Sequence, residues 1–167
     1  MEVIGIAGWS GSGKTTLVVA LLPCLIAQGL RVSTLKHAHH GFDLDKPGKD
    51  SHRHREAGAT EVLVSSAKRW AMFHELRGEP EPDLDQLMAR MAPVDLLIVE
   101  GFKEYPYPKI EVHRPSVGKP LLQLDDPNII AVASDAPLGG LTVPVLDLAD
   151  ADGIANFIIT HCRLKAA

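Results

Sequence analysis

The residues with the clearest chemistry lie near the start of the chain, where glycines are spaced around a lysine and a threonine. They run Gly8-Trp9-Ser10-Gly11-Ser12-Gly13-Lys14-Thr15 and fit the pattern G-x-x-x-x-G-K-[ST]. Glycines let the backbone fold tightly, so that successive N–H groups point at phosphate oxygens, and the helix that follows adds its positive end. In such a loop, Lys14 reaches the β- and γ-phosphates and the Thr15 hydroxyl binds Mg²⁺. The pattern predicts a nucleoside-triphosphate site.

Such a site also needs an acid that holds Mg²⁺ or a water bound to it. Asp95 and Glu100 flank one apolar segment, and an extended chain of that length separates them by roughly 16 Å. Ligands of a parallel α/β sheet gather at the carboxyl ends of the strands, so only Glu100 can lie beside the glycine-rich loop. We therefore expect Glu100 to bind Mg²⁺ with Thr15, and Asp95 to be an exposed residue at the strand entry. Gly101 would let the backbone pass close to phosphate.

Base recognition points to a third acid, because one carboxylate can accept both the ring N–H and the amino group of guanine. The Asn/Thr-Lys-x-Asp sequence familiar from guanine recognition is absent from this chain. Asp135, however, follows a buried apolar segment and lies at the ligand end of the expected sheet. Asp135 is therefore the candidate base-contacting residue, and the alternative is an ordinary Asp-Ala-Pro turn.

A polar loop after the second expected strand also begins on the ligand side of the sheet. Its candidate residues for a second substrate are His37, Asp45, Lys49 and Asp50. The acids could position a water or support Mg²⁺, and the lysines could meet an anionic substrate. The alternative is a solvated loop in which Asp50 caps a helix. This part of the chain also contains several histidines, whose spacing is not typical of a zinc site. They are His37, His39, His40, His52 and His54.

The composition is that of a globular protein. The chain has 167 residues, 46% apolar and 23% charged, with a net charge of −4, which indicates a single domain over residues 1–167. The mild acidity argues against a protein that coats nucleic acid. The longest apolar run, 17–27, contains Pro23 and is too short to cross a membrane, and no secretory signal is present. We expect Cys24 and Cys162 to be reduced and buried, and the protein to be cytoplasmic.

Apolar patterns alternate between strand and helix along the chain. We expect helices at 15–28, 50–57, 84–91 and 150–163, and strands at 2–8, 31–36, 61–65, 69–74, 95–100, 109–113 and 128–133. Residues 109–113 alternate between polar and apolar, which favours an edge strand. The order of these elements predicts an α/β fold of three layers, with a mainly parallel sheet and a small antiparallel extension.

Several blocks of sequence carry a family resemblance over nearly the whole chain, from Val3 to about Phe157. In order, they are GWSGSGKTT at 8–16, LKHAHH at 35–40, DKPGKDS at 45–51, EAG at 56–58, RW at 69–70, VEGFK at 99–103 and IAVASD at 130–135. Together these blocks resemble the family of molybdopterin-guanine dinucleotide biosynthesis protein B (MobB). The glycine-rich loop alone is shared by many P-loop NTPases.

The resemblance implies a GTP-binding accessory protein with weak GTPase activity. Such a protein is a homodimer that assists the guanylyltransferase MobA in attaching GMP to molybdopterin, and molybdopterin itself could be a ligand. The family's phosphate loop matches residues Ser10, Gly11, Ser12, Gly13, Lys14, Thr15 and Thr16. The block 99–103 takes the acidic, Mg²⁺-binding role, which agrees with Glu100, and Gly101 adjoins the nucleotide. The block from His37 to Ser51 borders the site.

Two other functions fit the same loop. A small-molecule kinase would transfer the γ-phosphoryl group to an acceptor, with Arg53 and Arg55 in a lid over the site. A pure binding module would use nucleotide only to order a surface, without meaningful hydrolysis. In the leading interpretation Lys14 and Glu100 are the catalytic residues, and hydrolysis is slow because the sequence shows no obvious arginine finger or water-orienting glutamine.

Overall fold

The computed structural model describes residues 1–38 and 41–165. They belong to two compact units, Met1–His37 with Ala92–Ala167, and Ala38–Met91. The single domain over residues 1–167 stays a prediction.

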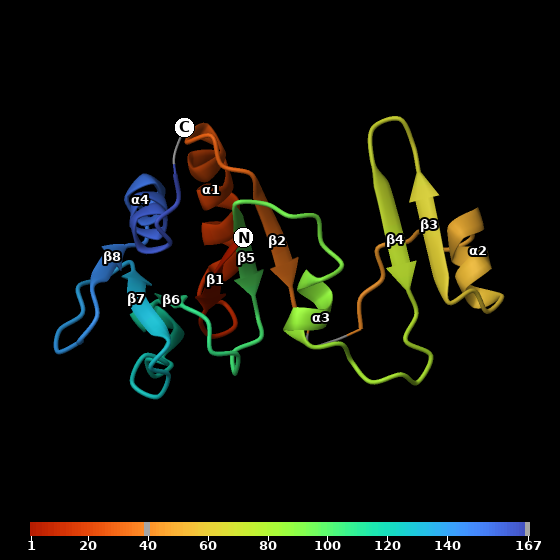
Figure 1. Ribbon diagram of the computed structural model, residues 1–167. Helices are drawn as coiled ribbons and strands as arrows, with labels where there is room; N and C mark the ends of the chain where they lie inside the picture. The colour runs from red at the N-terminus through yellow and green to blue at the C-terminus, as the bar shows by residue number, and fades with distance from the viewer. Residues whose placement is uncertain (39–40, 166–167) are drawn as a thin grey trace. The chain divides into compact units, whose positions relative to one another are not determined.

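A six-stranded sheet forms the centre of the first unit (Figure 1). Its strands lie in the order β2-β5-β1-β6-β7-β8, and every neighbouring pair is parallel. The strands are β1 (Glu2–Ala7), β2 (Val32–Lys36), β5 (Leu96–Glu100), β6 (Lys109–His113), β7 (Ile129–Ser134) and β8 (Val145–Asp147). The carboxyl ends of all six strands therefore meet at one edge, where a ligand site is expected.

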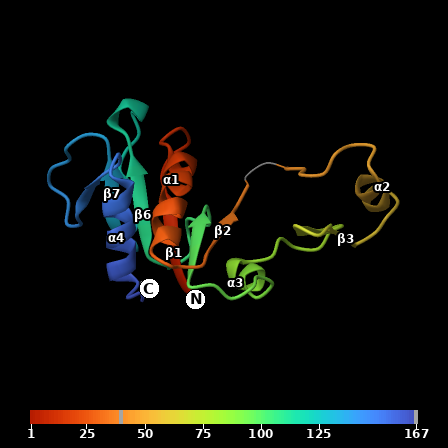
Figure 2. The same cartoon turned by 90° about the horizontal axis from the view of Figure 1, so that it is seen from above.

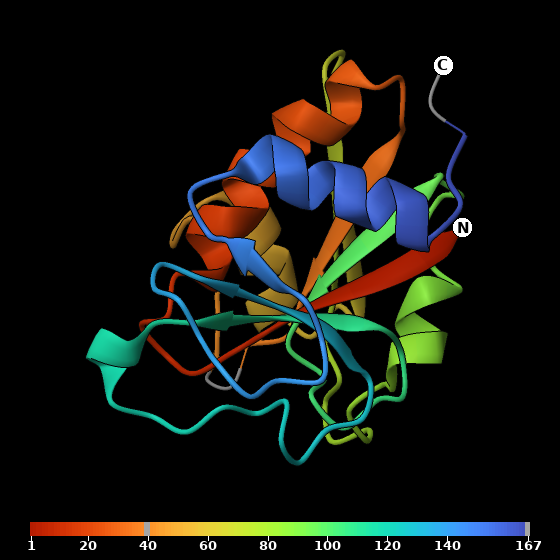
Figure 3. The same ribbon diagram turned by 90° about the vertical axis from the view of Figure 1, so that its left-hand side faces the viewer.

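Two helices, α1 (Lys14–Ala27) and α4 (Ala151–His161), pack together on one face of this sheet (Figure 3). Apolar residues of β1, β5, β6 and β7 point to the helices, and the inward positions of the helices are also apolar. This core contains Ile4, Ile6, Leu17, Leu21, Leu25, Leu96, Ile98, Ile110, Val112, Ile154 and Ile158. On the other face, Tyr107 lies against Gly5 of β1, and the loop after β6 meets Glu111. A short 3₁₀ turn, η1 (Pro115–Val117), follows β6.

The second unit holds a hairpin of β3 (Glu61–Ser65) and β4 (Trp70–His74), with α2 (Asp50–Glu56) beside β3 (Figure 2). A further short helix, α3 (Leu84–Met88), begins with a capping box between Asp83 and Gln86. Arg55 on α2 ties this unit together. Its guanidinium binds the carboxylates of Asp43, Asp45 and Glu75 and lies 5.2 Å from the centre of the Phe73 ring. The predicted mainly parallel α/β sheet with a small antiparallel extension is thus confirmed.

The expected edge strand at 109–113 is wrong, because β6 lies inside the sheet between β1 and β7. Its polar residues are buried and satisfied rather than solvated. Lys109 forms a 2.8 Å ion pair with Asp126, and the Glu111 carboxylate accepts the N–H groups of Leu122 and Gln123 at 2.9 Å each. The alternation of polar and apolar residues in 109–113 indicated that one face of this strand meets solvent. Instead, the loop that follows β6 provides the partners of Lys109 and Glu111.

Smaller expectations also need correction. The strand β8 was not expected, because three residues are too short for a periodic signal. Lys49 rather than Asp50 occupies the N-cap of α2, and no side chain caps that helix. Both cysteines are free but only half-buried, so burial is incomplete at Cys24 and Cys162. Burial and the nearby charge of Glu2 raise the pKa of the Cys162 thiol to about 11.

Replacing Lys109 with methionine tests the buried ion pair. The change leaves the Asp126 carboxylate, which is 25% exposed, without its cation, so we expect the free energy of unfolding to fall by about 2 kcal/mol. The matched control is Arg31→Met, which removes the exposed ion pair of Arg31 with Asp95 and should cost no more than about 1 kcal/mol. Urea unfolding of both variants measures the difference. Equal losses would contradict the structural role assigned to Lys109.

Candidate functional site

The glycine-rich loop joins β1 to α1 at the carboxyl edge of the sheet and has the backbone that its glycines allow. Gly8, Gly11 and Gly13 have φ angles of 140°, 81° and 99°, which L side chains rarely adopt. A Cβ on Gly8 would lie 2.5 Å from the carbonyl oxygen of Val112. Gly13 forms the left-handed N-cap of α1, so the first N–H groups of that helix, which have no partner within it, open on the loop.

Two side chains inside the loop fit an anionic ligand. The Lys14 ammonium donates to the carbonyl oxygen of Trp9 at 2.9 Å, which holds it over the loop. Burial lowers the pKa of Lys14, as do the nearby charges of Lys103 and Lys36, while Glu100 opposes them. The Ser12 hydroxyl is buried and has no hydrogen-bond partner in the described part of the chain. A buried hydroxyl is costly when unsatisfied, and a phosphate oxygen or a water at the loop would satisfy it.

Glu100 lies where an acid must lie to share a cation with the loop. The parallel pairing of β1 with β5 sets Ile6 opposite Glu100, and the Thr15 hydroxyl donates to the two carboxylate oxygens of Glu100 at 3.0 and 3.2 Å. The Lys36 ammonium lies 3.4 Å from the same carboxylate. Asp95 lies at the opposite end of β5, where its hydrogen bonds to Arg31 lower the pKa of its carboxyl group.

The donors present suit Mg²⁺. Thr15 and Glu100 offer hard oxygen atoms, and Mg²⁺ is commonly held by one or two protein oxygens together with phosphates and water. Within residues 1–38 and 41–165, no group of three or more His, Cys, Asp or Glu side chains is placed to hold a metal ion. Thr15 and Glu100 would therefore supply two of the ligands of such a cation, and a bound molecule or water would supply the others.

The backbone just after Glu100 is clamped from two sides. Gly101 and Phe102 have φ angles of 110° and 46°, both left-handed. From β2, the His37 N–H donates to the Glu100 carbonyl oxygen at 2.8 Å, and the His37 ring lies 4.7 Å from the Phe102 ring. From the other side, the Tyr107 hydroxyl donates to the Gly101 carbonyl oxygen at 2.8 Å. Strained backbone held by its surroundings is typical of functional sites.

Asp135 lies directly after β7, at the same edge of the sheet. A hollow of about 330 Å³ adjoins it, lined by Ser134, Asp135, Ala136, Pro137, Val145, Leu146 and Asp147. Arg114, which follows β6, donates from Nη1 to Asp135 at 2.5 Å and from Nε to the Ser12 carbonyl oxygen at 3.0 Å. The structure thus brings Asp135 and the glycine-rich loop into one chain of contacts.

Comparisons with known proteins reveal a family. The family model described as "Molybdopterin guanine dinucleotide synthesis protein B", MobB, matches residues 3–135. The chain belongs to the MobB family. Among relatives it is similar to the "Molybdopterin-guanine dinucleotide biosynthesis adapter protein" of Escherichia coli, with 46% identity over 95% of this chain and 92% of the relative. The protein of that name in Haemophilus influenzae is 45% identical over 95% and 88% of the two chains.

Solved structures agree with this membership. A crystal structure of molybdopterin-guanine biosynthesis protein B is similar to this chain, with a TM-score of 0.77 and 29% identity, over 96% of this chain and 99% of the other. A MobB homologue from Bacillus stearothermophilus gives a TM-score of 0.70 and 28% identity over 98% and 99%. The predicted family and the P-loop NTPase fold are confirmed. No described helix of this MobB chain is both long and apolar enough to cross a membrane.

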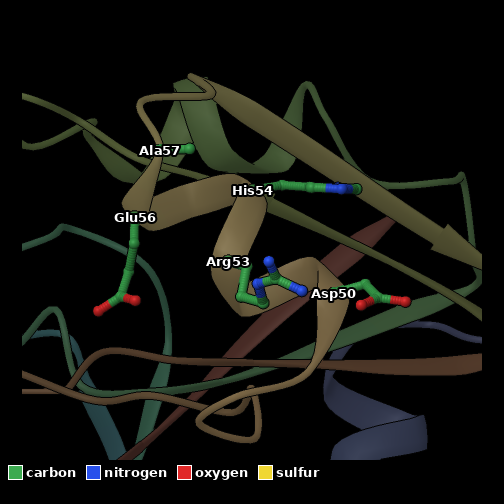
Figure 4. A pocket seen from close by; sticks show the side chains of 5 residues that line it. All are labelled: Asp50, Arg53, His54, Glu56 and Ala57. Atoms are coloured by element: carbon green, nitrogen blue, oxygen red, sulfur yellow. The ribbon is translucent and has the colours of Figure 1, made fainter.

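The expected substrate-loop residues of this MobB chain divide between the two units. His37 packs against Gly101 in the first unit. Asp45, Lys49 and Asp50 lie in the second, where Asp45 accepts from Ser51 at 2.8 Å and pairs with Arg55, which gives it a structural role. A hollow of about 470 Å³ lies along α2 (Figure 4), with charges of both signs in its lining of Asp50, Arg53, His54, Glu56 and Ala57. His39 and His40 lie outside the described residues.

Sequence reasoning missed Arg114, Tyr107 and Lys103 in this MobB chain. Arg114 directly follows β6, so the rule that selected Asp135 would also have selected it had 109–113 been assigned to an inner strand. Lys103 lies 5.3 Å from the centre of the Trp9 ring, and Tyr107 acts through a backbone carbonyl. Neither of these two contacts leaves a signal in residue spacing.

Gly101→Ala tests the clamp behind Glu100. A methyl group at this position would lie 2.6 Å from the His37 Cβ atom, on a backbone with φ of 110°. We therefore expect the free energy of unfolding to fall by about 3 kcal/mol. Gly118→Ala is the control, since Gly118 has φ of 66° and open space around it, and should cost about 1 kcal/mol. Chemical unfolding measures both, and an equal loss would show that the contact with His37 is unimportant.

Proposed function

We propose that this protein is a GTP-binding adapter in the biosynthesis of molybdopterin-guanine dinucleotide, with slow hydrolysis of the bound GTP. The family and the names of its relatives support the biosynthetic role. The observation that carries the nucleotide assignment is the contact of Thr15 with Glu100 at the mouth of a left-handed glycine loop. These are the parts with which P-loop proteins bind Mg²⁺ and a triphosphate.

The end of the site at Asp135 fits guanine better than adenine. The Asp135 carboxylate can accept from both N–H donors on the edge of guanine, a pair that adenine does not present. It borders the hollow beyond β7 and β8, at the carboxyl edge that also carries the phosphate loop. The Asp135 side chain is 37% exposed in the free protein. Once a bound base covers it, such an acceptor would discriminate strongly, because a base without the donors leaves it unpaired.

Each residue of the loop would have a defined part in hydrolysis. Thr15 and Glu100 would hold Mg²⁺, which would neutralise charge on the phosphates. Lys14 would place its ammonium against the β- and γ-phosphate oxygens, and the amides of residues 10–16 would cradle them. Glu100 already accepts from Thr15 and pairs with Lys36, so we do not assign it as the group that activates water. Turnover would then be slow, and a cation supplied by a partner could raise it by roughly 10³ to 10⁵.

The partners we propose are the guanylyltransferase MobA and, as its substrate, molybdopterin. An adapter needs surfaces for other proteins, and the nucleotide-bound state could order such a surface. The relatives are described as adapter proteins, which supports a role in assisting guanylyl transfer rather than performing it. Loss of GMP attachment by MobA when this protein lacks its Lys14 ammonium would be expected on this account.

We also propose that the protein is a homodimer whose copies meet at the β3–β4 hairpin. Alternate residues on one face of the hairpin are apolar and exposed, namely Leu63, Trp70 and Met72. The opposite face carries Val62 and Phe73, beside α2. A two-stranded sheet is marginal when alone and has two open edges. A second copy can cover this face with an identical surface about a two-fold axis.

Glu100→Gln and Asp95→Asn test the nucleotide assignment. Removing the charge of Glu100 should weaken Mg²⁺-dependent GTP binding by about tenfold or more. Asp95→Asn should leave binding unchanged, because Asp95 lies at the other end of β5. Calorimetric titration with GTP, in excess Mg²⁺ and in EDTA, measures both. The reverse order of effects would refute the assignment.

Met72→Glu tests the dimer. A carboxylate in the middle of the apolar hairpin face should raise the dimer dissociation constant by about thirtyfold or more. Leu124→Glu changes an exposed apolar residue of the first unit, 70% exposed against 44% for Met72, and should leave the dimer intact. Sedimentation velocity at several concentrations reports the assembly. A wild-type monomer, or a dimer that Met72→Glu leaves unchanged, would contradict this interface.

A further inference from the structure

We propose that Arg114 is a positioning residue that couples base recognition to the phosphate loop. The inference rests on the proposed function, since it concerns how the two ends of the GTP site act together. The contacts of Arg114 are with Asp135, Ser12 and Gly13 rather than with the predicted Mg²⁺ ligands or the Lys14 ammonium. Its proposed action is indirect, through the orientation of Asp135 and of the loop backbone.

The contacts of Arg114 join three parts of the first unit. It directly follows β6 and forms the N-cap of η1. Its Nη1 donates to Asp135 at 2.5 Å, and its Nε donates to the Ser12 carbonyl oxygen at 3.0 Å. The guanidinium also lies against Gly13, where an added Cβ would be 3.4 Å from Nε. One planar group therefore spans from the base-contacting candidate to the last glycine of the phosphate loop.

The chemistry of arginine suits this task. The guanidinium is planar, stays charged and presents its donors in a fixed fork, so the position of Asp135 becomes tied to the position of Ser12. A carboxylate has about four acceptor directions, so Arg114 can hold Asp135 while guanine donors occupy the remainder. Lysine would keep the charge, but a single ammonium on a flexible stem cannot hold both partners in one geometry.

A comparison within the sheet separates coupling from a simple surface ion pair. Arg31 and Asp95 form a similar pair at the opposite edge of the sheet, with the arginine side chain 70% exposed. The Arg114 side chain is 36% exposed. Unlike Arg31, it also donates a hydrogen bond to the phosphate loop. Exposed ion pairs contribute little to stability. The effect of Arg114 should therefore appear in ligand binding, whereas Arg31 should affect neither the base nor the phosphates.

The test uses ligands that reach different parts of the site. GTP and ATP differ only in the base, and inorganic tripolyphosphate engages the loop without any base. Their affinities, in excess Mg²⁺, are measured by calorimetry for the full-length wild type and for Arg114→Gln, Arg114→Lys, Asp135→Asn and the double variant Arg114→Gln/Asp135→Asn. Arg31→Gln is the matched control. Thermal unfolding of each protein confirms that it is folded.

We expect Arg114→Gln to lower the preference for GTP over ATP by about tenfold, since it removes a charged hydrogen bond from Asp135. The decisive result is Asp135→Asn with tripolyphosphate. Coupling predicts that affinity falls about threefold, although this ligand has no base, whereas an aspartate that serves the base alone would leave it unchanged. The double variant should lose no more GTP affinity than either single variant. Arg114→Lys should also lose the preference for GTP over ATP.

Three outcomes would overturn the inference while leaving the proposed function intact. They are an unchanged base preference in Arg114→Gln and Arg114→Lys, an unchanged tripolyphosphate affinity in Asp135→Asn, or losses that multiply in the double variant. If Arg114→Gln does not fold, Arg114→Lys and Asp135→Asn decide. A wild type that does not bind GTP, or that binds ATP equally well, would instead refute the proposed function.

Discussion

The parallel pairing of β1 with β5 is the constraint on which the site depends. It sets Glu100 level with Ile6, one residue before the end of β1, and the tight loop that follows returns Thr15 to within hydrogen-bond distance of that carboxylate. A shift of the register by one residue would turn Glu100 to the other face of the sheet. The buried core formed by β1, β5 and α1 resists such a shift, so the geometry of the site follows from the packing of Ile4, Ile6, Leu96 and Ile98.

Around this pairing, three other strands contribute residues at or just beyond their carboxyl ends. β2 brings Lys36 and His37, β6 brings Arg114, and β7 brings Asp135. None of these side chains needs a special local conformation, because the parallel sheet delivers them all to one edge. The exceptions are Gly8, where the Val112 carbonyl oxygen leaves no room for a side chain, and Gly101, where the His37 Cβ atom does the same. Gly11 and Gly13 are needed for their positive φ angles.

Much of this arrangement was predictable from sequence, because it depends on order along the chain. The glycine-rich loop, the choice of Glu100 over Asp95 for that edge of the sheet, and the position of Asp135 follow from which end of an apolar segment a residue occupies. What could not be predicted depends on partners distant in sequence. Lys109 can be buried because it forms an ion pair with Asp126. From the sequence alone, a lysine in this alternating segment indicated an edge strand. Arg55 is held by acids from before and after α2, which residue spacing does not reveal.

The central claim is that the loop between β1 and α1 binds a guanine nucleotide with Mg²⁺. Calorimetric titration of the wild type and of Lys14→Ala with GTP, GDP and ATP, each with and without Mg²⁺, tests it most directly. We expect the wild type to bind GTP more tightly than ATP and to need Mg²⁺ for full affinity, and Lys14→Ala to stay folded but lose triphosphate binding. A wild type that binds no triphosphate, or a Lys14→Ala variant that binds GTP as the wild type does, would contradict the account.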